Sequence, residues 1–226
     1  MIDQQTTTAS NSKIDVPLSY FSIIIATYNR AQLLKRAINS LVLQTEEDWE
    51  AIIVDDGSTD TTYTQILPYL KKYPKIKYLK KEHSGEAMSK NEGIRMSSGK
   101  FISFLDSDDE YAPNHLQSRK HMLLENPHIN FLHGGFGIIG NRYVPDRFDN
   151  SKKIHLSECI VGGTFFIERN VLSLLNGYSE IHIGTDTDLF DRAKAAQIEI
   201  METNIPTYIY HHETQDSITN KLCMSL

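Results

Sequence analysis

Short apolar runs alternate with segments of helical periodicity between residues 20 and 125 of this 226-residue chain. Three of the runs, Ser22–Ala26, Ala51–Val54 and Lys100–Leu105, have the apolar character of strands that are buried on both faces of a parallel sheet. The segment between the first two runs places its apolar residues at helical spacing. This alternation predicts an α/β fold with an open, mainly parallel sheet, right-handed crossovers and flanking helices.

The remaining elements are expected to be less regular towards the C-terminus. Further strands are predicted at Ile76–Leu79, Ile129–His133, Val161–Ile167 and Pro206–His211. A helix is predicted after Asp60, which can cap it, and Pro68 should kink or divide this helix. Other helices are predicted at Glu86–Ser97, Pro113–Glu125, Arg169–Leu175 and Thr187–Gln197.

A chain of this length fits one domain of ordinary size. We therefore expect a single domain over residues 18–226. Residues 1–17 are expected to form a flexible tail, because their Thr, Ser, Gln and Asn side chains bury little apolar surface.

The charge balance and cysteine content argue against several classes of protein. A net charge of −6 argues against nucleic-acid binding, which relies on clustered Lys and Arg. No apolar run approaches the roughly 20 residues that span a bilayer, and the N-terminus lacks the pattern of a secretory signal. Two cysteines without metal-ligand spacing suit a reducing cytoplasm. We expect a cytoplasmic protein, with peripheral contact at the inner membrane face left open.

Polar residues follow three of the predicted strands at the point where each strand ends. These groups are Thr27 to Asn29, Asp55 with Asp56, and the cluster Asp106-Ser107-Asp108-Asp109. In an open α/β sheet the ligand site lies beyond the carboxyl ends of the strands, so the three groups are expected to share one rim. The alternative for any single position is an ordinary turn or helix cap.

The acidic cluster suits a hard divalent cation. Three carboxylates within four residues repel one another unless a cation or solvent offsets their charge. Mg²⁺ or Mn²⁺ commonly takes one or two carboxylates and completes its shell with phosphate oxygens and water. The cluster therefore predicts binding of a diphosphate through the metal. No G-x-x-x-x-G-K-[ST] or G-x-G-x-x-G loop follows the first strand, which disfavours a P-loop NTPase or a dinucleotide dehydrogenase.

Four segments in succession resemble the donor-site motifs of the family 2 glycosyltransferases. They are SIIIATYNR at 22–30, VDDGSTD at 54–60, SGEAMSKNEGI at 84–94 and GKFISFLDSDD at 99–109. The resemblance implies the GT-A fold, with a nucleotide-binding half at about 20–125 and an acceptor-binding half at about 126–215. It also implies metal-dependent, inverting transfer of a hexose or N-acetylhexosamine from a UDP-sugar to a glycan or lipid-linked acceptor, as in the synthesis of surface polysaccharide or glycolipid.

The same resemblance implies roles for individual residues. Asp56 would hydrogen-bond the base, Asp106 would lie nearer the sugar or ribose, and Asp108 is the favoured ligand for Mn²⁺ or Mg²⁺. Asp109 and His212 are further metal candidates. The residues implied to bind the nucleotide-sugar are Ala26, Thr27, Tyr28, Arg30, Asp56, Lys90, Asp106 and Ser107. Position 90 is commonly Arg in the family, and Lys can pair with phosphate only as a point charge.

The later half resembles the family's acceptor segment at LNGYSE, 175–180, and IGTDTDLFDR, 183–192. The alignment implies that Asp186 is the general base, which takes the proton of the acceptor hydroxyl as its oxygen attacks the anomeric carbon. Thr185 stands where the family often has Glu. The alternative is that Asp186 only caps a helix. Gly162-Gly163-Thr164 either lines the acceptor pocket or serves turn geometry and packing.

Two other functions are consistent with parts of the pattern. A sugar-phosphate nucleotidyltransferase shares the sheet and the metal, but it requires a Gly- and Lys/Arg-rich loop after the first strand, which ATYNR lacks. A non-catalytic module that binds nucleotide-sugar or glycan is favoured only by Thr185 in place of Glu.

Overall fold

The computed structural model describes residues 18–146, 152–181 and 184–213. The predicted tail at 1–17 and the end of the predicted acceptor half lie outside these ranges. One eight-stranded sheet has the order β3-β2-β1-β4-β9-β6-β10-β5. Its strands are β1 (Phe21–Thr27), β2 (Trp49–Asp55), β3 (Ile76–Lys80), β4 (Phe101–Phe104), β5 (Glu110–Tyr111), β6 (Phe131–Gly140), β9 (Phe166–Glu168) and β10 (Ile200–His212). A separate antiparallel pair is formed by β7 (Tyr143–Pro145) and β8 (Lys153–His155).

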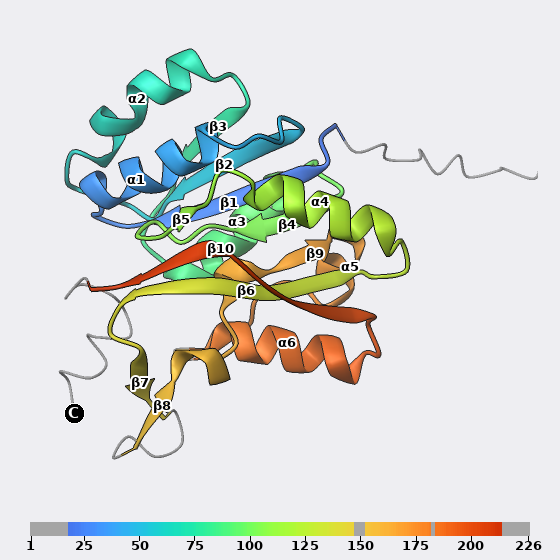
Figure 1. Cartoon of the computed structure of the whole chain (residues 1–226). Coiled ribbons are helices and arrows are strands. Elements are labelled where there is room, and N and C mark those ends of the chain that lie inside the picture. The colour runs from blue at the N-terminus through green and yellow to red at the C-terminus, as the bar shows by residue number, and fades with distance from the viewer. Residues whose placement is uncertain (1–17, 147–151, 182–183, 214–226) are drawn as a thin grey trace, which may run out of the picture.

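Helices cover both faces of the sheet (Figure 1). They are α1 (Ala31–Val42), α2 (Thr62–Lys72), α3 (Glu86–Met96), α4 (His115–Glu125), α5 (Arg169–Leu174) and α6 (Thr185–Ala195), with 3₁₀ turns at Leu156–Glu158 and Gly162–Thr164. Successive residues of β1 point to opposite faces: Ile23 and Ile25 pack in the core under α1, α2 and α4, whereas Ile24 packs with α3, α5 and α6. This continuous burial explains the unbroken apolar run.

The predicted fold class is confirmed. Strand β1 is parallel to both β2 and β4, β2 is parallel to β3, and β6 is parallel to β10. The antiparallel members are β9, which pairs with β4 and β6, and β5, which pairs with β10. The sheet is therefore mixed: the alternating first half of the sequence builds the parallel block β3-β2-β1-β4, and the later half adds the parallel pair β6 and β10.

Several element predictions are wrong in detail. Strands β6 and β10 run over Phe131–Gly140 and Ile200–His212, further than the predicted Ile129–His133 and Pro206–His211. Val161–Ile167 is not one strand, because the chain first makes the 3₁₀ turn at Gly162–Thr164 and then enters β9. The Thr164 hydroxyl closes that turn by donating to the Val161 carbonyl at 2.7 Å. The last helix begins at Thr185 rather than Thr187, because Gly184 supplies a left-handed backbone at φ 77°.

Helix α2 continues through Pro68 over Thr62–Lys72, so of the two effects predicted for this proline the division does not occur. The predicted capping role of Asp60 is met by its carboxylate, which accepts hydrogen bonds from the Thr62 backbone at 2.9 Å and from the Thr62 hydroxyl at 2.5 Å. The other oxygen of Asp60 accepts from the backbone of Ala31 at 3.2 Å. One side chain thus ties the starts of α1 and α2 together.

Strands β6 and β10 are held by a buried guanidinium. Gly134 and Gly135 have positive φ values of 86° and 71°, opposite a register shift in β10 between Thr203 and Tyr208. The Arg119 side chain is fully buried and donates to the carbonyls of Gly134, Gly135 and Ile205 at 3.1 to 3.2 Å. These bonds fix the bulge from which the last part of β10 runs back towards the acidic cluster.

Substitution of Gly93 should destabilise the fold. Its missing Cβ would lie 2.5 Å from Ile24 Cγ2, so α3 can approach β1 only with glycine here. We expect Gly93→Ala to lower the unfolding free energy by about 1 to 2 kcal/mol in urea titrations, because overpacking exceeds the helix propensity gained. Gly137→Ala is the matched control, since its Cβ meets no atom within 4 Å. Equal stability of the two variants would contradict this account of the packing.

Candidate active site

The ends of β1, β2 and β4 meet at one rim of the sheet, as predicted. The backbone of Asp56 donates to the Thr27 carbonyl at 2.9 Å, and Leu105 donates to Ile24 at 3.0 Å. Asn29 joins the first two ends, because its amide oxygen accepts from the backbones of Thr59 and Asp60 at 2.8 and 3.2 Å. Asn29 itself has a positive φ of 52°, a conformation that Asn tolerates better than most residues.

Asp56 is buried and holds the loop that follows β3. One carboxylate oxygen accepts from Lys81 Nζ at 2.8 Å and from the Ser84 backbone at 2.9 Å. The other accepts from the Gly85 backbone at 2.8 Å and lies 2.8 Å from His83 Nδ1. Burial acts to raise the pKa of Asp56, but the hydrogen bonds outweigh it and the pKa is lowered. Asp56 is therefore an ionised anchor for residues 81–85.

An aromatic surface lies beside this anchor. The rings of Tyr28 and His83 stack with their centroids 4.3 Å apart, and Tyr28 is 43% exposed. Of the other residues predicted at the end of β1, Ala26 is partly buried. Thr27 is buried, and its hydroxyl has no hydrogen-bond partner among the described residues. A flat, partly exposed ring next to a carboxylate can contact a planar base.

The three carboxylates of the acidic cluster take three different partners. Asp108 forms an ion pair with Arg30, and its backbone carbonyl accepts from Arg36. Asp109 is buried, and its oxygens accept from the Tyr208 hydroxyl at 2.6 Å and the His211 backbone at 2.7 Å. Asp106 faces Lys90, at 3.4 Å from Nζ. These contacts offset the predicted repulsion only in part, because burial and the charges of Asp106 and Asp108 still raise the pKa of Asp109 well above its usual range.

Lys90 is the centre of the site. It is 3% exposed, and its Nζ lies 2.6 Å from Glu86, 3.4 Å from Asp106 and 3.9 Å from Asp186. The aromatic rings of Phe104 and Tyr178 stand 5.7 and 5.3 Å from the same atom. One ammonium group therefore brings together α3, the loop after β4 and the first turn of α6. The predicted residues Lys90, Asp106 and Asp186 meet here.

One cation cannot offset three anions equally. Glu86, the nearest, has its pKa lowered by the charge of Lys90. Burial raises the pKa of Asp106 to about 6, and the charges of Glu86 and Asp186 add to this effect while Lys90 opposes it. Burial also raises the pKa of Asp186, again opposed by Lys90. The surroundings of Lys90 thus hold excess negative charge, and both Asp106 and Asp186 have increased proton affinity.

Asp186 stands in the first turn of α6, and its two oxygens differ. Oδ2 accepts from the Gly162 backbone at 3.2 Å. Oδ1 is buried and has no hydrogen-bond partner among the described residues, with Lys90 at 3.9 Å. Asp188, two residues on, is instead paired with Arg192 at 2.9 Å and Ser179 at 2.7 Å. The arrangement holds Asp186 by one oxygen and leaves the other able to accept a proton.

The remaining predicted residues are peripheral to this group. Ser107 and His212 are both buried, and the Nδ1 atom of His212 lies 2.7 Å from the Asn141 carbonyl. No group of three His, Cys, Asp or Glu side chains within 18–146, 152–181 and 184–213 is arranged to hold a metal ion.

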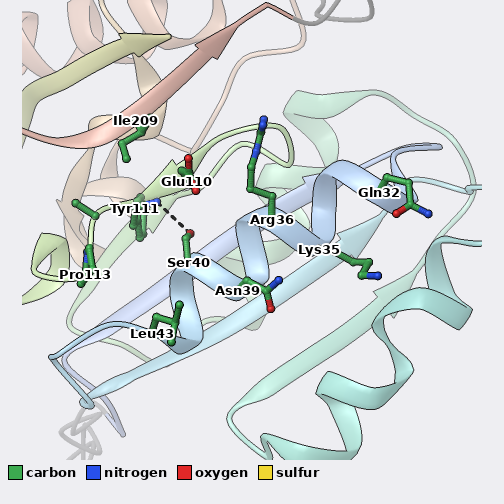
Figure 2. Close-up of a pocket in the computed structure, with 11 residues that line it drawn as sticks. Gln32, Lys35, Arg36, Asn39, Ser40, Leu43, Glu110, Tyr111, Pro113 and Ile209 are labelled. Atoms are coloured by element: carbon green, nitrogen blue, oxygen red, sulfur yellow. Dashed lines mark hydrogen bonds between the residues drawn. The ribbon is translucent and has the colours of Figure 1, made fainter.

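A groove of about 610 Å³ lies between α1, β5 and β10 (Figure 2). None of the predicted site residues lines it. Its floor is closed by the Tyr111 backbone, which donates to the Ser40 hydroxyl at 3.0 Å. Arg36 projects from α1 at one end of this groove and contacts the Asp108 backbone, so the groove and the acidic cluster share one side chain.

Three contributors escaped the sequence reasoning. Glu86 has no role in the sequence analysis, although a glutamate four residues before a lysine on one helix predicts an ion pair between them. Tyr208, which donates to Asp109, lies 99 residues away in the sequence and gave no local signal. The sequence allows Gly162 either to line an acceptor pocket or to serve packing; in the structure its backbone N–H donates to Asp186.

The excess charge predicts a stability effect with a defined sign. Between the ordinary pKa of an aspartate and a value of about 6, the folded protein binds more protons at Asp106 than the unfolded chain does. Stability should therefore fall as pH rises through this window. We expect Asp106→Asn, measured by urea unfolding in metal-free buffer, to be more stable than the parent by about 1 to 2 kcal/mol at pH 7.5. The gain should vanish near pH 4; a gain independent of pH would contradict the assignment.

Comparison with known proteins places this site in a family. The family model described as Glycosyl transferase family 2 matches residues 22–183. A UDP-Glc:alpha-D-GlcNAc-diphosphoundecaprenol beta-1,3-glucosyltransferase, WfgD of Escherichia coli, is 34% identical over 158 residues, which are 67% of this chain and 61% of that protein.

Two solved structures resemble the fold. TarS 1-349 of S. aureus in complex with UDP-GlcNAc has a TM-score of 0.72 at 21% identity, over 89% of this chain and 60% of that one. The mannosyltransferase PcManGT of Pyrobaculum calidifontis in complex with GDP-Man and Mn²⁺ has a TM-score of 0.70 at 15% identity, over 92% and 61% of the two chains. This chain thus spans about 60% of these proteins. The likeness confirms the predicted GT-A fold, and the chain belongs to glycosyl transferase family 2.

Proposed function

We propose that this chain is an inverting glycosyltransferase that moves a hexose or N-acetylhexosamine from a UDP-sugar to a lipid-linked or glycan acceptor. One observation carries the proposal: Lys90 joins Asp106, at the end of β4, to Asp186, in the first turn of α6. A group suited to the donor and a group suited to the acceptor thus share one buried cluster, although they lie 80 residues apart in the sequence.

Asp186 is the proposed general base. Its Oδ2 is held by Gly162, so Oδ1 can take the proton of the acceptor hydroxyl while the hydroxyl oxygen attacks the anomeric carbon. The raised pKa of Asp186 favours this role, because a base works best when its pKa approaches the working pH. Attack from the face opposite the departing UDP forms the new glycosidic bond as the old one breaks, with inversion.

Lys90 and Arg30 are the proposed cationic contacts for the diphosphate. Lys90 is fixed beside Asp106, and Arg30 pairs with Asp108. A donor phosphate can compete for the Arg30 guanidinium, which is well shaped for bidentate binding of oxyanions. Tyr28 and Asp56 are proposed to contact the uracil base. Four donors already surround the Asp56 oxygens. We propose that the imide N–H of uracil replaces His83 among them, because the His83 side chain is 58% exposed.

A divalent cation fits the residues present, because the cluster holds excess negative charge and carboxylate oxygens suit Mn²⁺ or Mg²⁺. Asp106 and Asp108 would hold it. Asp109, whose two oxygens already accept hydrogen bonds, serves better as a tether for the loop. When bound, the cation would neutralise charge on the departing diphosphate. The Mn²⁺ present in the PcManGT complex supports this part of the proposal.

The relatives support the proposed acceptor class. The name of WfgD gives a diphosphoundecaprenol-linked sugar as its substrate, so a lipid-linked acceptor is proposed here. Such an acceptor would place the reaction at a membrane face, and we propose the cytoplasmic one. The described part of the chain contains no helix with the length and apolar character of a membrane span.

The proposal is tested by assaying UDP-glucose, UDP-galactose, UDP-GlcNAc and UDP-GalNAc with Mn²⁺ and a diphospholipid-linked GlcNAc acceptor. We expect one donor to be used, with an inverted anomeric centre in the product by NMR. Asp186→Asn should lower kcat by about 10²- to 10⁴-fold, the usual contribution of a general base, while UDP affinity measured by calorimetry stays within twofold.

Asp188→Asn is the matched control, because this neighbouring carboxylate is engaged with Arg192 and Ser179. It should keep turnover near that of the parent. Full activity of Asp186→Asn, or retention of the anomeric configuration, would refute the mechanism. Binding of UDP without turnover on any donor would favour the non-catalytic alternative.

A further inference from the structure

Two adjacent glycines in the 3₁₀ turn at Gly162–Thr164 are in close contact with the site. A Cβ on Gly162 would lie 2.1 Å from Asp186 Oδ1 and 2.3 Å from its Cγ. A Cβ on Gly163 would lie 2.1 Å from the Tyr208 hydroxyl oxygen and 2.3 Å from Cζ. Neither glycine is among the described residues with positive φ. Glycine is therefore needed here for close approach rather than for backbone conformation.

Gly162 determines where the Asp186 carboxylate lies. Its backbone donates to Oδ2 at 3.2 Å, and its bare Cα leaves the space that the carboxylate occupies. The Asp186 side chain is 29% exposed, so it can rotate away from an added methyl group at little cost in stability. What such a methyl would change is the direction of Oδ1 relative to Lys90 and the reacting atoms.

Gly163 acts on the other side, through a fully buried ring. The Tyr208 hydroxyl donates to Asp109 at 2.6 Å, and the Asp109 backbone donates to the Asp106 carbonyl at 3.0 Å. Tyr208 is 0% exposed and cannot swing into solvent. A methyl group at position 163 would push the ring away and release Asp109, and with it the loop that carries Asp106 and Asp108.

We propose that Gly162 and Gly163 are two positioning residues with separate tasks: Gly162 sets the base Asp186, and Gly163, through Tyr208, sets the acidic loop that holds the donor. This inference rests on the proposed function, since it assigns the glycines to the base and the donor loop of that reaction. The two glycines are adjacent in sequence, but Gly162 contacts a side chain of α6 and Gly163 contacts a side chain of β10. Their substitution should therefore change different quantities, kcat for Gly162 and UDP affinity for Gly163.

The experiment compares Gly162→Ala, Gly163→Ala and the control Gly137→Ala, whose Cβ meets no atom within 4 Å. For Gly162→Ala we expect kcat to fall about 100-fold with unchanged UDP affinity, because small misplacements of a reacting group are costly. For Gly163→Ala we expect calorimetric affinity for UDP with Mn²⁺ to fall about tenfold, as for loss of a hydrogen bond to a charged group. Gly137→Ala should match the parent in both.

A double variant shows whether Gly162 acts through Asp186. In an Asp186→Ala background the clash is absent, so adding Gly162→Ala should lower kcat no further. Tyr208→Phe supplements Gly163→Ala should the latter unfold. It keeps the ring and removes the hydroxyl's bond to Asp109 at 2.6 Å together with its longer contacts to Asp106 at 3.5 Å, so it should weaken UDP binding in the same way. A crystal structure of Gly162→Ala should show the carboxylate displaced from the Gly162 N–H.

The possible failures are distinguishable. If Asp186→Ala retains turnover, the proposed function fails. If Asp186→Ala is inactive but Gly162→Ala keeps the parental kcat, or lowers it equally in the Asp186→Ala background, the role of Gly162 is refuted. If Gly163→Ala and Tyr208→Phe bind UDP with parental affinity, the role of Gly163 is refuted. Equal loss of UDP affinity and kcat in both glycine variants would reduce them to general packing residues.

Discussion

The site depends on one buried ammonium group that serves three carboxylates. Lys90 lies on α3 and contacts Glu86 on the same helix, Asp106 after β4 and Asp186 on α6. Removing the lysine would leave three carboxylates without a cation, so the positions of the elements that carry them depend on this one side chain. The Lys90 contacts explain how a helix between two early strands comes to fix a residue almost a hundred positions later. Helix α3 packs closely on β1, where position 93 has room only for glycine, and this packing fixes the helix that carries Lys90.

The division of the acidic cluster follows from the same electrostatics. Each carboxylate has a different nearest partner: Lys90 for Asp106, Arg30 for Asp108 and Tyr208 for Asp109, although the Tyr208 hydroxyl also reaches Asp106 at 3.5 Å. The contacts are unequal in kind. Asp109 is buried and its hydrogen bonds use both oxygens, so it belongs to the scaffold, whereas Asp106 remains partly exposed with a pKa raised to about 6. A residue that costs stability in this way, at the edge of a well-packed sheet, is typical of a site selected for binding rather than for folding.

The sequence was sufficient for what depends on local pattern. Burial on both faces made the parallel strands visible, and the topology then required Asp56 and Asp106 to share a rim. The partners of Asp109 could not be predicted, because Tyr208 and His211 lie about a hundred residues further along the chain and carry no periodic signal. The prediction of one strand at Val161–Ile167 is wrong because of contacts with residues distant in the sequence. Its apolar residues are buried, but two glycines in close contact with the side chains of Asp186 and Tyr208 lie in a 3₁₀ turn.

The site is built from residues of both halves of the chain. The proposed donor-side groups come from α3 and the loop after β4, and Tyr208 of β10 holds that loop. The turn before β9 holds Asp186 on α6, which reaches the same lysine. Because β9 runs antiparallel between β4 and β6, the later half is inserted into the same sheet rather than appended to it. A shift of either half would therefore change the Lys90 to Asp186 distance and the Tyr208 to Asp109 hydrogen bond together. The strand order thus makes the geometry between the proposed base, Asp186, and the proposed donor loop a property of the sheet core.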